Sequence, residues 1–181
     1  MKLAQPVQTP FKASPFYYII IIIGILLLVL HFFEMTPNHI TVFKLDGPSM
    51  YPTFQTDDIV LITTSSHQKK QLHHGQFVVV KQSPFVEEKM LKRIIGLPGD
   101  HLVVEKGQII RNGEIIEEPY LNEPNWFIST PFDQILKDNE IYVMGDNRNH
   151  SDDSRTFGVI NLDTQYVGVI IKKVEGKENS Q

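Results

Sequence analysis

The chain has 181 residues, which is enough for one well-packed domain and too few for two domains of ordinary size. Its 17 Lys and Arg against 21 Asp and Glu give a formal net charge of -4, so a general nucleic-acid binder that neutralises phosphates is disfavoured. The absence of cysteine excludes a disulfide framework, a cysteine nucleophile, a thiolate zinc site and a cysteine-ligated iron–sulfur cluster.

The first predicted element is an apolar helix over residues 16–33, with the sequence FYYIIIIIGILLLVLHFF. These residues carry no formal charge and would cover about 27 Å as a helix, close to the hydrocarbon thickness of about 30 Å. A buried helix in a soluble protein would have to be enclosed on every side. A cleavable signal peptide usually has an apolar run of about 7–15 residues and a small-residue cleavage site, which this segment lacks. We therefore predict a transmembrane signal anchor over 16–33.

The charges on either side of the apolar segment predict its orientation. Lys2 and Lys12 precede the segment, and Glu34 follows it. Because positive charges stay on the cytoplasmic side, we predict a cytoplasmic tail over 1–15 and an extracytoplasmic domain over 34–181. The expected location is the cell membrane, in a single-pass protein with the lipid bilayer as a partner.

Beyond residue 34 the pattern changes to short runs rich in Val and Ile, separated by turn residues, which is typical of strands. The sequence therefore predicts a mainly β domain. The candidate strands are Ile40–Leu45, Asp58–Thr64, Gln76–Lys81, Lys89–Ile95, His101–Glu105, Gln108–Ile116, Ile141–Met144 and Tyr166–Lys172.

Two tight turns are predicted from their residues. Asn112-Gly113 lies between two apolar pairs and predicts a type I′ hairpin turn, which needs positive φ at both positions. Pro98-Gly99 has the residues of the central positions of a type II turn. The histidines His67, His73 and His74 lie in a polar connection without a third ligand on a regular element, so we interpret them as surface residues and expect no metal.

Three segments carry reactive side chains, and the first contains Ser49. Pro48 and Pro52 bracket this serine and restrict the residues before them, which favours an extended or turn conformation at Ser49. The backbone N–H of Ser49 is free to help bind an oxyanion. A proline-rich turn whose serine only bonds to the backbone is the alternative.

The second segment contains Lys92. Strand alternation places Met90, Lys92 and Ile94 on one face of a strand, so the lysine lies between two apolar neighbours. Burial disfavours the charged amine and lowers its pKa, which suits a general base near neutral pH. The alternative is a lysine whose stem lies over apolar surface while its ammonium reaches water. Lys89, next to two glutamates, is expected to be solvated.

The third segment, Gly145–Arg155, follows an apolar strand and has five formally charged residues in eleven. A solvated loop is one interpretation. The other is a hydrogen-bonded brace of Asp, Asn, Ser and Arg side chains between buried pieces, in which an Asp–Arg pair fixes the loop and a hydroxyl orients a lysine.

Taken together, the three segments resemble the type I signal peptidases, which are membrane-anchored Ser/Lys endopeptidases. The sequences SMYPT at Ser49–Thr53, KRIIGLPGD at Lys92–Asp100 and GDNRNHSDDSR at Gly145–Arg155 match the family's boxes in the family's order. The resemblance extends from about residue 16 to about residue 172 and is closest to the compact Gram-positive form. It implies a single catalytic β domain behind one N-terminal transmembrane helix.

The resemblance also implies the chemistry. Ser49 would be the nucleophile, and Lys92 the general base that takes its proton. The reaction would be acyl transfer through an ester on Ser49, with Lys92 later activating water, and no cofactor or metal is implied. The substrates would be preproteins whose signal peptides are to be removed.

The remaining site residues follow from the same resemblance. Ser151 would hydrogen-bond and orient the Lys92 amine. Structural ion pairs would join Asp153 to Arg155.

A second structural pair would join Asp146 to Arg148 or to Arg93. The substrate peptide would lie extended near Phe43–Gly47 and Lys89–Lys92. Met50 and Gly47 would line a shallow pocket for small side chains.

Two positions depart from the family pattern. Gly47 stands where some members have a serine that helps hold the oxyanion, and losing such a donor can cost about 2.7–4 kcal/mol. We expect the Ser49 N–H, with a backbone group or water, to serve instead. Pro48 stands where an acidic or small residue would be expected, and it is tolerable because it restricts Gly47, which is permissive.

Two alternative functions remain. A self-cleaving repressor uses the same Ser/Lys chemistry, but the apolar anchor argues against it. A membrane-anchored binding protein could keep the fold without catalysis, but the intact Ser49 and Lys92 argue against that.

Overall fold

The computed structural model describes residues 14–32, 40–124 and 131–174. The chain divides into two compact units, residues 1–37 and 38–181, and each is considered by itself. Most of the tail predicted over 1–15 lies outside the described residues, which begin at residue 14.

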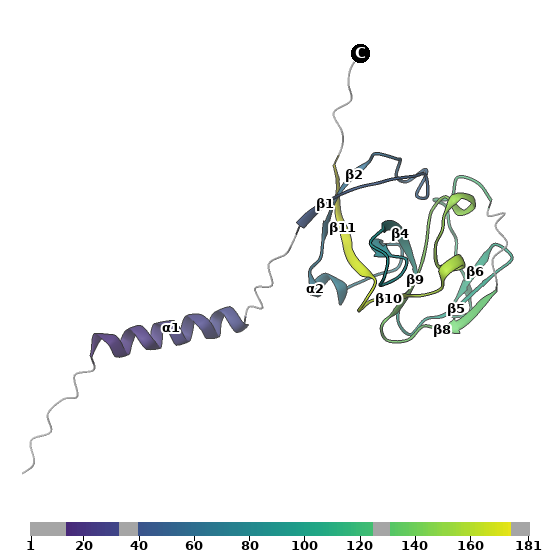
Figure 1. Cartoon of the computed structure of the whole chain (residues 1–181). Coiled ribbons are helices and arrows are strands. Elements are labelled where there is room, and N and C mark those ends of the chain that lie inside the picture. Colours follow the sequence, from purple (N-terminus) through teal and green to yellow (C-terminus); the bar gives the residue numbers. More distant parts are fainter. Residues whose placement is uncertain (1–13, 33–39, 125–130, 175–181) are drawn as a thin grey trace, which may run out of the picture. The chain divides into compact units, whose positions relative to one another are not determined.

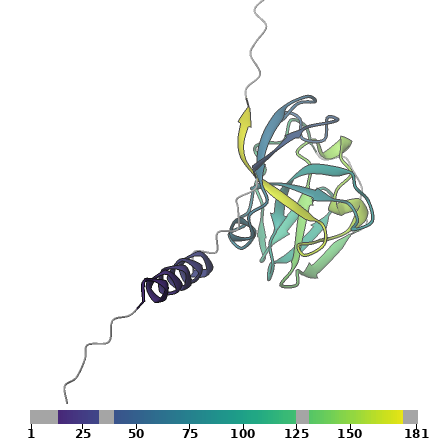
Figure 2. The same cartoon turned by 60° about the vertical axis from the view of Figure 1, so that its left-hand side comes forward.

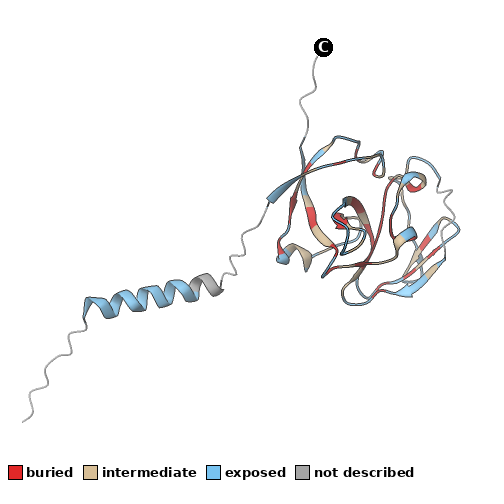
Figure 3. Ribbon diagram, viewed as in Figure 1, coloured by how far each residue is buried: buried red, intermediate tan, exposed pale blue. Residues whose placement is uncertain are grey.

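The first unit contains one helix, α1 (Pro15–Phe32), so the predicted helix is confirmed. Its described side chains, over residues 15–28, are all exposed, as Figure 3 shows. Among the helices within the described residues, none has the length and apolar character needed to cross a membrane. The anchor therefore stays a prediction.

The second unit is mainly β, as predicted. A seven-stranded antiparallel sheet has the order β1-β2-β11-β3-β4-β9-β10. A four-stranded antiparallel sheet has the order β7-β6-β5-β8, and Figure 1 places it at the far end of this unit from β1. The strands of the first sheet are β1 (Ile40–Lys44), β2 (Ile59–Thr63), β3 (Phe77–Lys81), β4 (Lys89–Gly96), β9 (Glu140–Met144), β10 (Ile160–Asn161) and β11 (Tyr166–Val174). Those of the second are β5 (His101–Glu105), β6 (Gln108–Arg111), β7 (Glu114–Ile115) and β8 (Phe132–Ile135).

Both predicted turns are confirmed. Asn112 and Gly113 have φ of 55° and 85° and join β6 to β7. Gly99 has φ of 85°, and the Asp100 N–H donates to the Leu97 carbonyl at 3.0 Å, which closes the turn before β5.

Apolar side chains are buried on both faces of the large sheet. Along β3, Val78 and Val80 belong to one core cluster with Ile94 and Val143, whereas Val79 belongs to another. This explains why the strand is a continuous apolar run, since a strand covered on both faces has no polar side. Figure 2 shows the long strand β11, in yellow, crossing this unit beside β2 and β3.

Five short elements were not predicted. β8 is largely exposed, and it is defined by its pairing with β5. β10 has only two residues, which pair with β9. The short helices α2 (Ser66–Lys69), η1 (Arg148–His150) and α3 (Ser154–Phe157) lie in segments read as loops. Elements of two to four residues carry no sequence period, so their neighbours determine them.

Candidate active site

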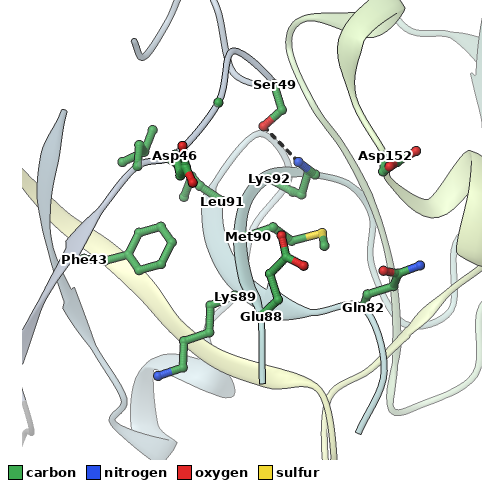
Figure 4. Close-up of a pocket in the computed structure, with 12 residues that line it drawn as sticks. Phe43, Asp46, Ser49, Gln82, Glu88, Lys89, Met90, Leu91, Lys92 and Asp152 are labelled. Carbon is green, nitrogen blue, oxygen red and sulfur yellow. Dashed lines mark hydrogen bonds between the residues drawn. The ribbon is translucent and has the colours of Figure 1, made fainter. Parts of the chain in front are cut away.

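The three segments with reactive side chains meet at one cavity of about 510 Å³. Figure 4 shows Ser49 on the turn after β1, Lys92 on β4, and Asp152 on the loop after β9 at the other side of the cavity. The lining residues are Phe43, Leu45, Asp46, Gly47, Ser49, Gln82, Glu88, Lys89, Met90, Leu91, Lys92 and Asp152. The structure thus brings together residues that are up to about a hundred positions apart in the chain.

Lys92 and Ser49 are in direct contact. The Lys92 Nζ donates a hydrogen bond to Ser49 Oγ at 3.0 Å. The predicted burial of Lys92 is confirmed, since the residue is only 2% exposed, and Lys89 is exposed as expected. Lys92 pairs with Val78 of β3, in the middle of the sheet, so the strand itself fixes where the amine can lie.

Burial changes the protonation of this amine. It lowers the pKa of Lys92 from 10.5 to about 8, although the carboxylates of Asp153, Asp152 and Glu88 act in the opposite direction. The reason is that the charged amine loses its hydration inside the protein. A neutral amine 3.0 Å from a hydroxyl can accept its proton. The distance between Lys92 and Ser49 and the lowered pKa of the amine therefore suit general-base catalysis.

The turn that carries Ser49 is held by its own backbone and by the loop after β9. The Tyr51 N–H donates to the Pro48 carbonyl at 3.0 Å. The Asn147 backbone N–H donates to the Ser49 carbonyl at 3.1 Å, and its side-chain Nδ2 donates to the Pro48 carbonyl at 3.1 Å. Gly47 has φ of 80°, a conformation that strains any residue with a Cβ, which is why glycine suits this position.

Gly145 allows the loop to approach the nucleophile turn. A Cβ at this position would lie 2.4 Å from the Ser49 carbonyl oxygen and 2.2 Å from Ser151 Oγ. Both distances are too short for any real contact, so a residue with a side chain would displace the Ser49 backbone. Gly145 thus sets the spacing between the loop and Ser49.

The choice of partner for Asp146 is settled by the geometry. Arg93 Nε donates to Asp146 Oδ1 at 2.7 Å and Nη2 donates to Oδ2 at 2.6 Å, in a bidentate pair. The Thr53 hydroxyl donates to the same carboxylate. Arg148, the other predicted candidate, instead pairs with Glu118. The contact of Glu118 with this loop was not predicted from the sequence.

The pair of Asp153 and Arg155 lies where it was predicted. Asp153 is fully buried, and Arg155 Nε and Nη2 each donate to its carboxylate at 2.8 Å. The Gly145 N–H donates to the same carboxylate at 3.0 Å. Asp153 therefore fixes the backbone of the residue that touches Ser49.

Two predictions differ from the structure. The predicted hydrogen bond between Ser151 and Lys92 is not formed, because the Ser151 hydroxyl turns toward the Asp152 carbonyl, at 3.5 Å. Met50 does not line the cavity; it is 1% exposed and packs in the core with Leu45.

The apolar lining comes from neighbouring strands instead. Phe43 and Leu45, with Met90 and Leu91 of β4, form it, and Gly47 lines the cavity as predicted. Leu45 contributes both to the lining and to the core in which Met50 lies.

None of the three clustered histidines lines this cavity. His67, His73 and His74 are exposed, and His74 Nε2 lies 2.7 Å from Asp100 Oδ2, in the turn before β5. Throughout the described part of the chain, no three His, Asp or Glu side chains converge as metal ligands would.

Comparison with known proteins identifies relatives of this chain. The family described as "Signal peptidase, peptidase S26" matches residues 14–172. "Signal peptidase I V" of Bacillus subtilis is 34% identical over 140 residues, which cover 71% of this chain and 82% of that protein. "Probable signal peptidase I-2" of Synechocystis sp. is 34% identical over 117 residues, which cover 62% of this chain and 53% of that protein.

A solved structure is also similar. The crystal structure of a signal peptidase I from Enterococcus faecalis has 27% sequence identity and a TM-score of 0.44. The match covers 54% of this chain and 95% of that one.

Proposed function

This chain belongs to the signal peptidase family, peptidase S26, and on that premise we propose that it is a membrane-anchored serine endopeptidase that removes N-terminal signal peptides from exported preproteins. The observation that carries the proposal is the contact between the buried Lys92 amine and Ser49 Oγ, at 3.0 Å, inside a cavity. Burying a lysine destabilises the fold, and strongly perturbed pKa values cluster at functional sites, so this lysine beside a hydroxyl points to catalysis.

The proposed reaction has two steps. The neutral Lys92 amine takes the proton of the Ser49 hydroxyl as Ser49 Oγ attacks the carbonyl carbon of the scissile bond. The C–N bond then breaks, the proton passes from Lys92 to the leaving amine, and an ester remains on Ser49. Lys92 next takes a proton from water, whose oxygen attacks the carbonyl carbon of the ester. The ester C–O bond then breaks, the proton passes from Lys92 to Ser49 Oγ, and the signal peptide leaves with a carboxylate end.

The oxyanion of each step needs hydrogen-bond donors. Within the described residues, the Ser49 backbone N–H donates no hydrogen bond, so it is available for this role. With Gly47 in place of a serine, a backbone group or a water supplies the second donor. Such donors act on charge that develops only in the transition state, which is why they accelerate the reaction.

The substrate would bind as an extended peptide in the cavity. β1 is the first strand of its sheet, so one of its edges is open to pair with another strand. Phe43, Leu45, Met90 and Leu91 supply apolar walls beside Ser49. These walls fit the small side chains expected before the cut.

We propose that α1 anchors the chain, on the strength of its composition and of the exposed side chains over residues 15–28. The full chain, expressed in bacterial membranes, is expected to stay in the pellet after extraction at pH 11. A variant with Ile22→Lys and Leu26→Lys is expected to move to the supernatant, because each charge at the centre of a span costs about 2.5–3.5 kcal/mol. Extraction of the unsubstituted chain would contradict the anchor.

Cleavage of a preprotein by the purified full chain in detergent tests the proposed activity. We expect a shortened product whose N-terminal sequence begins directly after a signal peptide. Ser49→Ala is expected to give no product, since the attacking oxygen is lost while the fold is kept. A protein that binds preproteins equally well in both forms and cleaves in neither would support the alternative of a binding protein without catalysis.

Replacing Asp152 should change the pH dependence of cleavage. Its charge favours the ammonium form of Lys92, so Asp152→Asn is expected to lower the pKa of Lys92 further. The acid limb of kcat/KM, expected near pH 8, then moves to lower pH by less than about one unit, because Asp152 is exposed and screened by solvent. Glu114→Gln on β7 is the control and should leave the limb in place. A shift to higher pH would contradict this electrostatic role.

A further inference from the structure

The segment that follows β7 makes contacts that the proposed chemistry does not use. Glu118 accepts a hydrogen bond from Arg148 Nη1 to its Oε2 at 2.7 Å, and Arg148 Nη2 donates to its other oxygen. The side chains are only 9% and 1% exposed, respectively, so this ion pair is buried. Burying a charge is costly, and the bidentate geometry is what makes it tolerable.

Tyr120 extends the same cluster toward a second arginine. Its hydroxyl donates to Glu118 Oε1 at 2.6 Å and accepts from Arg148 Nη2 at 3.3 Å. Its ring centroid lies 3.8 Å from the Cζ of Arg93, a separation at which a guanidinium is attracted to an aromatic ring. Arg93 also contacts the ring of Phe77, at 4.4 Å. Tyr120 therefore touches both arginines of the site.

These two arginines hold the loop that holds Ser49. Arg148 Nε donates to the Gly145 carbonyl at 3.1 Å, and Arg93 holds Asp146 in its bidentate pair. Asn147 follows directly, between Asp146 and Arg148, and donates to the carbonyls of Ser49 and Pro48. Glu118 is thus connected to the nucleophile turn through one side chain and one short loop.

We propose that Glu118 and Tyr120 are positioning residues, which fix Arg148 and Arg93 so that the loop at 145–148 keeps Ser49 Oγ within reach of Lys92 Nζ. The proposal rests on the function proposed above for Ser49 and Lys92. Neither Glu118 nor Tyr120 lines the cavity, so neither is expected to touch the substrate. Their effect should appear in the chemical step and not in binding.

Neutralising Glu118 shows why the effect should be large. Glu118→Gln keeps the side-chain volume but removes the carboxylate that pairs with the buried guanidinium of Arg148. An unpaired buried charge is unfavourable, so we expect this guanidinium to move toward water, where it can be hydrated. That movement releases the Gly145 carbonyl and the loop beside it. A displacement of about 1 Å at a reacting atom can cost about 10²-fold in rate.

The test uses the full chain in detergent with one preprotein substrate. Glu118→Gln is expected to lower kcat by about 10-fold to 100-fold and to leave KM within about two-fold. The acid limb should stay in place, because the charges with the largest effects on the pKa of Lys92 are those of Asp153, Asp152 and Arg155. Glu117→Gln is the matched control, since it makes the same change at the exposed adjacent residue, and it should match the wild-type chain. Circular dichroism confirms that each variant is folded.

A double variant tests whether Glu118 acts through Arg148. The double variant, Glu118→Gln with Arg148→Gln, should have a kcat no lower than that of the slower single variant. The reason is that each substitution breaks the same ion pair. Additive losses would overturn the proposed route.

A folded Glu118→Gln chain with a wild-type kcat, or with the loss confined to KM, would overturn the proposal. If this variant does not fold, Tyr120→Phe decides: it keeps the ring over Arg93 and removes only the hydroxyl. Because the loss of a neutral hydrogen-bonding group has a modest net effect, kcat should fall by about two-fold to five-fold at constant KM. An unchanged kcat in folded Tyr120→Phe would then overturn the proposal. Failure of the wild-type chain to cleave would overturn the proposed function and this inference with it.

Discussion

Lys92→Met is expected to abolish preprotein cleavage while making the folded domain more stable at neutral pH. Methionine has nearly the length of lysine and suits a position that is 2% exposed, so the core around β4 should accept it. The amine that takes the Ser49 proton is lost, and kcat/KM is expected to fall by at least about 10⁴-fold, as when a member of a catalytic triad is removed.

The stability change follows from the pKa of the buried amine. The pKa of Lys92 is about 8 in the folded chain, against 10.5 for an ordinary lysine, so between these pH values the unfolded chain binds more protons. Below pH 8 both states are charged, and the buried charge destabilises the fold by about 3 kcal/mol, at 1.36 kcal/mol per pH unit. This destabilisation disappears as the pH rises from 8 to 10.5. Lys92→Met should therefore be more stable than the wild-type chain at pH 7, with a difference that shrinks toward pH 10.

Urea unfolding at pH 7 and pH 10 measures this difference, and contributions from all other groups cancel in the comparison. Lys89→Met is the matched control, since it makes the same change at an exposed position of the same strand. A stability difference between Lys92→Met and the wild-type chain that is equal at the two pH values would show that Lys92 does not titrate as a buried group.

The elements that could be predicted from the sequence are those whose cause is local. Asn112-Gly113 and Pro98-Gly99 adopt their turns because glycine and asparagine tolerate positive φ. The burial of Lys92 could be predicted because side chains two residues apart lie on one face of a strand, and those on either side of it are Met90 and Ile94. In each case the physical reason lies within a few residues of the position concerned.

The features that could not be predicted depend on residues far away in the chain. Arg148 and Arg93 were equal candidates for Asp146, and the choice depends on Glu118, which lies 30 positions before Arg148. The family resemblance predicted Met50 in the pocket, but the turn directs its side chain into the core with Leu45. The orientation of Ser151 depends on a single side-chain torsion, which no sequence pattern records.

Asp153→Ala is expected to be the most destabilising change in the loop after β9. The fully buried Asp153 carboxylate accepts hydrogen bonds from Arg155 Nε, Arg155 Nη2 and the Gly145 N–H. Its removal leaves the Gly145 N–H without this acceptor and the buried Arg155 without this counter-charge, which should lower the free energy of unfolding by about 3–5 kcal/mol. Asp163→Ala is the control: it breaks the exposed pair with Lys69 and should leave the free energy of unfolding nearly unchanged.

Cleavage should fail together with stability in Asp153→Ala, because Gly145 sets the spacing to the Ser49 carbonyl. The double variant Asp153→Leu with Arg155→Met separates the two effects. It replaces the buried pair with apolar side chains and should recover much of the unfolding free energy, since such replacements are often neutral or stabilising. It should not recover cleavage, because the hydrogen bond to the Gly145 N–H stays absent. A double variant that cleaves at the wild-type rate would show that Asp153 serves the fold alone and that the loop needs no such fixing to present Ser49 to Lys92.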